Sequence, residues 1–312
     1  MSYNVGALTA YVEQQNYPLI RKSLLGAKTP TIVNKQTGVK GSATLNIIDE
    51  DATFQPGGCG FTPTGSSTLT QRTITTGFIS VQKKWCPTDL DGYYAQTQLN
   101  AGSYNDAIPF EETFMQLQTD YINQNIETAL WQGNTTSGTN NLSYFNGFLQ
   151  VISSSQAFVT GSVKVSSSAG LPITASNVIS IIDGIYTNIP AQVLNKPDLA
   201  IFVGFDTFRT YTTALKNQNL FNYAVNTTSD FEITLPGTTI KLIALNGLNG
   251  TNQIVAARKS NLYMGVDLES DSTDFKLWYS QDFDEVRMKA RFRIGCQVAF
   301  PQEIVYWYNG QV

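Results

Sequence analysis

The chain has 312 residues, and charged side chains make up 14% of them, against about 25% in an average soluble domain. The formal net charge of −4 argues against a uniformly basic nucleic-acid-binding protein. The sequence contains no histidine, which excludes Ser-His-Asp and Cys-His nucleophilic systems, histidine-based zinc sites and the usual side chain for acid–base catalysis near neutral pH. We therefore expect a protein that is not an enzyme and that holds no cofactor.

The expected cellular compartment follows from the lack of long apolar stretches, the N-terminal sequence and the cysteines. No stretch reaches the ~18 consecutive apolar residues of a membrane helix, and the start at Met1 lacks the apolar run of a signal peptide. We therefore expect a cytoplasmic protein without a membrane partner. Cys59, Cys86 and Cys296 are too scattered for a disulfide framework. Cys59 and Cys86 flank one predicted hairpin, where they either stay reduced or form a disulfide.

Residues 1–42 are predicted to form an extended arm, because prolines and glycines interrupt every periodic pattern there. The arm has a local excess of positive charge over its single acid, Glu13. Such a segment either lies near nucleic acid or is simply solvated. The basic residues of the arm are Arg21, Lys22, Lys28, Lys35 and Lys40.

A protruding hairpin is predicted next. Alternating residues begin near Leu45, a glycine-rich stretch occupies 56–67, and alternation resumes over 69–85. Because an isolated hairpin is marginal in water, we expect it to pack on a neighbouring subunit and not on its own core. The acids Asp49, Glu50 and Asp51 are interpreted as a solvated strand end or a charge partner for a neighbour, with cation binding as the alternative.

A long helix is predicted over 110–131, opened by Pro109 and ended by Gly133. Phe114, Leu117 and Tyr121 recur at helical spacing, and we expect this row to pack on a sheet. A neighbouring row is also apolar. It consists of Met115, Ile122, Ile126, Ala129 and Leu130. The Ser-rich residues 153–170 are predicted to form a surface loop.

A second compact region begins near residue 171. The spacing of Val178, Ile181, Ile182 and Ile185 predicts a helix that ends before Pro190. A buried strand over 199–203, a helix capped by Asp206, and strands over 239–245 and 253–257 follow. This order indicates a small α/β or α+β domain.

Residues 286–300 show the clearest pattern, strict alternation of apolar and polar side chains. This predicts a long antiparallel strand with one buried row, which includes Cys296 as a buried thiol. The opposite row is basic: Arg287, Lys289, Arg291 and Arg293. These cations either contact DNA phosphates or an acidic neighbour, or pair across the sheet with acids chosen from Asp267, Glu269, Asp271, Asp274, Asp282 and Asp284.

The order of these elements resembles the Hong Kong 97 (Johnson) fold of tailed-bacteriophage major capsid proteins. Residues 110–134 resemble its spine helix with the usual glycine exit, 146–149 the step that follows, 235–240 an axial-domain strand entry and 295–305 the closing strand. The sequences Gly58-Cys59-Gly60-Phe61 and 86–90 are similar to capsid proteins of phages that infect Bacteroidetes, including crAss-like phages.

The resemblance implies an α+β fold with a defined division of the chain. It places the N-terminal arm at 1–42, the E-loop hairpin and following strand at 43–85, a peripheral domain with its spine helix at 86–170, an axial domain at 171–262, and a return to the peripheral sheet at 263–312. Lys83 and Lys84 lie near the hairpin base and not at its tip, which argues against the covalent crosslinking known in some members.

The resemblance also implies function. It implies self-assembly into pentamers and hexamers of an icosahedral shell around double-stranded DNA, built in the bacterial host cytoplasm and retained in the virion. Portal, scaffolding or decoration proteins would be its partners. The cations expected to face DNA are Arg21, Lys22, Lys28, Arg287, Lys289, Arg291 and Arg293.

Two other functions stay open on the sequence alone. An encapsulin-like nanocompartment shell would share the fold and enclose a cargo enzyme in place of DNA. A secreted or tail-associated β-rich adhesin would suit the 15 Tyr and 4 Trp, but such proteins seldom carry a long amphipathic helix between a hairpin and an α/β unit.

Overall fold

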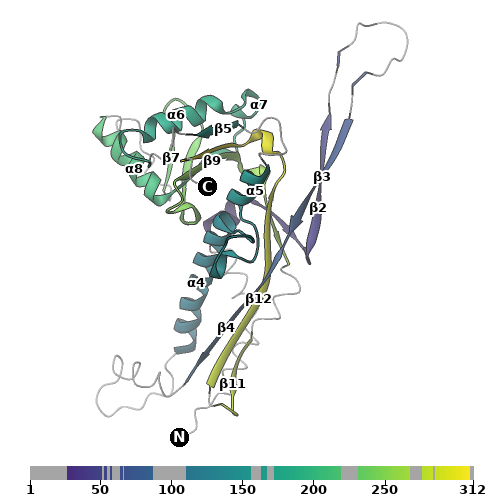
Figure 1. Cartoon of the computed structure of the whole chain (residues 1–312), viewed down its shortest axis with the longest axis vertical. Coiled ribbons are helices and arrows are strands. Elements are labelled where there is room, and N and C mark those ends of the chain that lie inside the picture. The colour runs from purple at the N-terminus through teal and green to yellow at the C-terminus, as the bar shows by residue number, and fades with distance from the viewer. Residues whose placement is uncertain are drawn as a thin grey trace.

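A computed structural model describes residues 27–50, 53–54, 57, 64–65, 67–86, 110–155, 163–166, 172–218, 231–267, 276–283 and 285–309. It contains a compact unit of helices over a sheet, a long helix that leads away from it, an elongated sheet beside that helix and a projecting hairpin (Figure 1). The mixed α+β class predicted from the sequence is confirmed.

The elongated sheet, called the peripheral sheet here, is organised by strand β12 (Glu285–Val298). Its apolar row is buried at Met288, Ala290, Phe292, Ile294 and Cys296, which confirms the predicted alternation. Antiparallel neighbours of β12 are β4 (Gly77–Trp85), β10 (Leu262–Val266) and β11 (Lys276–Ser280), and β1 (Asn34–Thr37) runs parallel to β10.

Helix α4 (Phe110–Gln132) confirms the predicted spine helix. Its packed face, however, is the row of Ile126, Ala129 and Leu130, while Tyr121 is 54% exposed. The expectation that the row with Tyr121 packs on the sheet is therefore wrong for Tyr121, and the side chains of Phe114 and Leu117 lie outside the described residues. Two adjacent apolar rows look alike in sequence, and only contact with the buried row of β12 decides between them.

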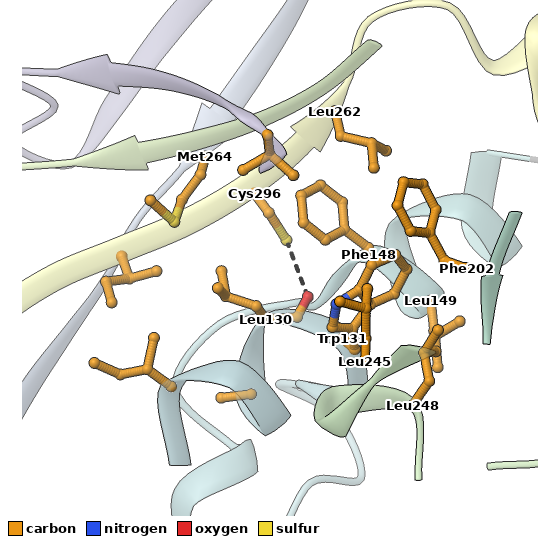
Figure 2. Packing of buried hydrophobic residues seen from close by; sticks show 14 of the residues in the cluster. Leu130, Trp131, Phe148, Leu149, Phe202, Leu245, Leu248, Leu262, Met264 and Cys296 are labelled. Atoms are coloured by element: carbon orange, nitrogen blue, oxygen red, sulfur yellow. Dashed lines mark hydrogen bonds between the residues drawn. The ribbon is translucent and has the colours of Figure 1, made fainter. Parts of the chain in front are cut away.

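The end of α4 is a crowded junction (Figure 2). Trp131 is fully buried, with its ring centroid 5.3 Å from that of Phe148 and 5.6 Å from that of Phe202. A Cβ at Gly133 would lie 2.6 Å from the Ala129 carbonyl oxygen, so only glycine fits this exit. The Cys296 thiol donates to the Leu130 and Asn146 carbonyls, and burial raises its pKa. The chain continues through η1 (Asn140–Leu142) to α5 (Phe148–Ser155).

The compact unit, called the axial unit, is built on a six-stranded sheet of order β5-β13-β9-β6-β8-β7. Helix α6 (Val178–Asn188) has the predicted buried face. Helix α8 begins at Phe205, so Asp206 lies in its first turn and is not its N-cap. The other elements are α7 (Ala191–Leu194), α8 (Phe205–Asn217), β6 (Leu199–Gly204), β7 (Glu232–Thr234), β8 (Lys241–Leu245), η3 (Asn246–Leu248), β9 (Gln253–Arg258) and η4 (Lys259–Asn261).

Two strands of the axial sheet correct the predicted division of the chain. Strand β13 (Val305–Tyr308), which follows η6 (Pro301–Glu303), pairs with β9, so the expected return to the peripheral sheet is wrong for these residues. Strand β5 (Val163–Ser166) pairs with β13, where a surface loop was predicted. Strands of four residues are too short for their pattern to show which sheet they join.

The predicted arm is also corrected. Residues 28–32 form helix α2 (Lys28–Ile32), and β1 adds a strand to the peripheral sheet, so the arm interpretation of 1–42 is wrong from residue 28 onward. Proline is tolerated in a first helical turn because its missing N–H would have no partner there, and Pro30 occupies such a position in α2.

The packed face of α4 is tested by truncation. Leu130→Ala removes a fully buried side chain, and we expect it to lower the free energy of unfolding by about 2–5 kcal/mol. Tyr121→Ala on the exposed side should change it by no more than about 0.5 kcal/mol. Denaturant titrations of both variants measure the difference. Equal losses would contradict the assigned face.

Candidate assembly surfaces

The predicted hairpin is formed by β2 (Ser42–Glu50) and β3 (Ser67–Thr75), paired in register from Ser42 opposite Thr75 to Glu50 opposite Ser67. It leaves the body at the end of the peripheral sheet and points away from it (Figure 1). Its two strands therefore divide into a root, near Ser42 and Thr75, and a distal half near Glu50 and Ser67.

The root crosses the peripheral sheet at a pair of glycines. Gly265 of β10 lies directly opposite Gly295 of β12. A Cβ at Gly295 would overlap the Thr75 carbonyl oxygen, and one at Gly265 would lie 2.8 Å from Cγ2 of Ile74, which is fully buried. The two missing side chains thus make room for the crossing.

Hydrogen bonds fix the root to the same place. Arg72 Nη1 donates to the Val298 carbonyl over 2.8 Å, and Gln297 Nε2 donates to the Thr73 carbonyl over 2.8 Å. The expectation that the hairpin packs only on a neighbour is therefore wrong for its root, which is part of this subunit's own core.

The distal half differs. Ile48 and Leu69 are cross-strand partners and lie 61% and 72% exposed, while Ile47, on the other face, is buried. Phe54, beyond the end of β2, is fully exposed. We call Ile48 and Leu69 the apolar pair. Within the described part of the chain nothing covers it, and it leaves an apolar surface exposed in the distal half of the hairpin.

A second surface lies on the face of the peripheral sheet opposite α4. The polar row of β12 shares it with β4 and β11, since paired residues point the same way. Lys289 is opposite both Gln82 and Lys276, and Arg287 is opposite both Lys84 and Trp278. We call this surface the cationic face. Its cations are Lys84, Lys276, Arg287, Lys289, Arg291 and Arg293.

Some of these charges are already engaged. Glu285 lies 2.7 Å from Lys84 Nζ and 3.2 Å from Arg287 Nη2. The hydrogen bond from Lys84 is the largest cause that lowers the pKa of Glu285, and the hydrogen bond from Arg287 lowers it to a smaller extent. Arg293 donates to the Lys40 carbonyl over 3.0 Å and lies 5.2 Å from the Phe78 ring centroid.

The acids predicted to pair across the sheet do not do so where they are described. Asp267 is buried and Asp282 exposed, and neither forms an ion pair with the row. Glu285 takes this role, and it lies on β12 itself. The remaining acids of that set, Glu269, Asp271, Asp274 and Asp284, lie outside the described residues.

The other sequence-predicted site residues are dispersed. Lys28 lies 3.8 Å from Glu232 with its side chain 29% exposed, and it does not belong to the cationic face. Arg21 and Lys22 lie outside the described residues. Lys84 and Lys276 were missed, because only the long-range register of β4 and β11 on β12 brings them to this face.

Candidate chemistry is sparse in the part of the chain that the structure describes. There, no group of three or more carboxylates or thiols gathers as a metal site, and Glu50 lies exposed at the end of β2. The side chain of Asp49 lies outside the described residues, and so do all atoms of Asp51 and Cys59. The predicted cation site and the predicted disulfide therefore stay untested. No helix among the described residues is long and apolar enough to span a membrane.

Comparison with known proteins gives a fold but no close relative. No family model and no curated sequence matches the chain. A chain of the satellite phage P4 procapsid with its size determination protein superimposes with a TM-score of 0.60 at 14% identity, over 94% of this chain and 90% of that one. The chain has the Hong Kong 97 fold.

Two further structures support the fold. The capsid of an empty GTA particle matches with a TM-score of 0.58 at 13% identity, over 91% of this chain and 90% of that chain. The capsid of the Myoviridae phage XM1 matches with a TM-score of 0.54 at 16% identity, over 89% and 88%. The fold predicted from the resemblance is therefore confirmed over most of both chains.

The glycine crossing is tested by adding one methyl group. We expect Gly295→Ala to cost about 1–3 kcal/mol, because the new Cβ must displace the backbone of Thr75. Gly184→Ala in α6, where nothing lies within 4 Å of the added Cβ, should be neutral or stabilising by up to about 1 kcal/mol. Thermal unfolding of both variants measures the contrast. An unchanged Gly295→Ala protein would show that the root does not rest there.

Proposed function

We propose that the chain is the major capsid protein of a tailed phage, which self-assembles into pentamers and hexamers of an icosahedral shell around double-stranded DNA. The observation that carries the proposal is the match to capsid subunits over about nine-tenths of both chains. A fold alone does not fix a function, so surfaces suited to assembly are needed as a second argument.

The hairpin supplies that argument. Its root is hydrogen-bonded to the peripheral sheet, while the apolar pair at its distal half is exposed. Burying a side chain of this size is worth about 1.5–3 kcal/mol, and a closed shell repeats the gain at every subunit. We propose that the distal hairpin packs on the next subunit of the shell, in a cyclic arrangement that closes upon itself.

The assembly role is tested at the apolar pair. We expect the double variant Ile48→Thr and Leu69→Thr to fold with unchanged stability, because both side chains are solvated in the single subunit, and to lose assembly. Threonine retains the strand preference of these positions. Analytical ultracentrifugation of wild type and variant, with far-UV circular dichroism for folding, gives the result.

A matched control is available on the same face. Asn46 and Gln71 are the next cross-strand pair toward the root, joined by a hydrogen bond of 3.0 Å. Replacing both by Thr should leave assembly intact. Normal assembly of the Ile48 and Leu69 variant, or of a chain that lacks the tip residues 57–67, would contradict the proposed contact.

We propose that the cationic face, together with Arg21 and Lys22, contacts the enclosed DNA by weak and diffuse charge. Lys276 and Lys289 are like charges directly opposite each other, an arrangement that is destabilising without a counter-charge. Phosphates would supply it without reading sequence. The alternative partner, an acidic surface of a neighbouring subunit, would require the same charge and is separated by the experiment below.

DNA contact is tested by filter binding of unassembled protein to two unrelated duplexes between about 50 and 200 mM salt. We expect no sequence preference. The log–log salt slope should fall by about 0.9 for each phosphate that the Lys276→Gln and Lys289→Gln variant no longer neutralises. Lys196→Gln with Lys216→Gln, both exposed on the axial unit, should change nothing. A tenfold preference for one duplex, or failed assembly with unchanged DNA binding, would contradict the proposal.

The finer parts of the proposal concern context. An origin in phages of Bacteroidetes, including crAss-like phages, is supported by the sequence around Cys59 and Cys86 alone. Portal, scaffolding or decoration proteins are proposed partners, and the virion capsid, assembled in the host cytoplasm, is the proposed location.

An encapsulin-like shell is the second candidate function. Several cations of the cationic face already interact with groups of the protein itself, which also suits a shell that encloses no DNA. The contents of purified particles, DNA or a cargo protein, distinguish the two.

A further inference from the structure

Aromatic side chains lie among the cations of the cationic face. Phe78 of β4 is directly opposite Arg293 of β12, and the Arg293 guanidinium lies 5.2 Å from the centroid of the Phe78 ring. Trp278 of β11 is directly opposite Arg287. Phe283 lies in the turn between β11 and β12, and the Arg287 guanidinium lies 4.6 Å from the centroid of its ring. Aromatic rings therefore accompany the first and the last arginine of this row.

Two of these rings are open to solvent. Phe283 is 65% exposed and Phe78 is 49% exposed. Large aromatic side chains are more often buried than left in water, and here the arginines do not bury them. A guanidinium covers one side of a ring and holds the ring in place through the cation–π attraction. The exposed fractions leave the other side of each ring available to a second flat partner.

The two exposed rings are joined by a row of positive charge. Lys289 and Arg291 lie between Arg287 and Arg293 on the same side of β12, because alternate residues of a strand share a face. At about 3.3 Å per residue, the step from Arg287 to Arg293 covers about 20 Å. The β4 residues paired with 289–293 carry no charge. No acid of β4 or of β12 itself therefore interrupts the row between these two arginines.

Two described carboxylates lie near the Arg287 end of the row. Glu285 forms ion pairs with Lys84 and Arg287, so its charge is already compensated. Asp282 is exposed and precedes Phe283 in the turn. A polyanion on this face would therefore meet one uncompensated carboxylate at one end and a row of cations beyond it.

Flat rings beside a row of cations are the chemistry that recognises unpaired nucleic acid. Cations neutralise the phosphates, and every base offers a flat face that stacks on an aromatic side chain. Bases inside a duplex stack on one another and present only their edges in the grooves, so an exposed ring gains nothing from them. Diffuse charge alone binds both forms, whereas the rings favour the single strand.

We propose that the cationic face takes single-stranded nucleic acid, with bases stacked on Phe78 and Phe283 and phosphates along the row from Arg287 to Arg293. This inference rests on the proposed contact of the face with nucleic acid, and it names the form that binds most tightly. Unpaired stretches of enclosed DNA and strands of RNA both offer this form. Neither ring reads the edge of a base, so the base sequence is not distinguished.

Fluorescence anisotropy of the full unassembled chain compares a labelled single strand of about 12 nucleotides with the same strand annealed to its complement. At about 200 mM salt, where charge contributes less than at low salt, we expect the single strand to bind at least about fivefold more tightly. Phe78→Leu with Phe283→Leu should remove this difference and leave duplex binding and the salt slope unchanged, because no charge is altered. The same strand made of RNA compares the two sources, and tighter binding of either form than of the duplex supports the proposal.

A matched control removes two exposed aromatic rings elsewhere. Tyr121 on α4 and Tyr186 on α6 are 54% and 36% exposed and do not belong to the cationic face. Tyr121→Leu with Tyr186→Leu should therefore behave as wild type. Because Phe283 lies in an exposed turn, Phe283→Leu alone gives a second variant if the double phenylalanine variant fails to fold.

Equal binding of single strand and duplex by wild type would overturn the inference and leave the proposed DNA contact standing. A lower salt slope in the phenylalanine variant would show that the rings only hold the arginines in place, which would overturn stacking. Loss of assembly with unchanged single-strand binding would assign the rings to a neighbouring subunit and overturn the inference as well. Absence of binding to either form would overturn both this inference and the proposed DNA contact.

Discussion

The alternation of strand β12 is the constraint on which the rest of the structure depends. Because successive side chains point to opposite faces, one row of this strand is buried against α4 and the other carries the cations. At Gly295 the polar row loses its side chain, and the hairpin root crosses the strand at that residue. A single strand thus positions the spine helix, the cationic face and the hairpin.

In this arrangement the hairpin keeps part of its apolar surface uncovered. A two-stranded hairpin cannot bury an apolar face by itself, and here only the root is covered by the subunit's own core. The apolar pair at the distal half is exposed on an arm whose base is fixed by glycines and hydrogen bonds. A base held by the subunit's own core and an uncovered distal half are what an element needs if its partner is another copy of the chain, because the direction of the hairpin then fixes the direction of the neighbour.

Local periodicity predicted the elements well, and long-range pairing explains most of what it missed. The spine helix, the hairpin and β12 each repeat a pattern over nine or more residues. Strand β13 is too short for that, and its place beside β9 depends on residues about fifty positions away. Tyr121 was placed on the wrong face because two apolar rows of one helix cannot be ranked without the partner surface.

The surfaces, too, were predicted only where a local sequence pattern marks them. The basic row of β12 was visible in the sequence, but its neighbours Lys84 and Lys276 belong to other strands, and their register on β12 is set by packing. The glycine crossing was equally hidden, since Gly265 and Gly295 gain their meaning only as a pair. The exposed ring of Phe78 gave no signal at all, because only the pairing of β4 with β12 brings it to the cations.

We propose that this subunit forms a closed shell with copies of itself. Electron microscopy of the purified wild-type protein, over a range of concentrations and salt, tests it most directly. We expect rings of five or six subunits, tubes or closed shells, in which the hairpin lies on the adjacent subunit. A protein that stays monomeric under all these conditions, with its fold intact, would contradict it.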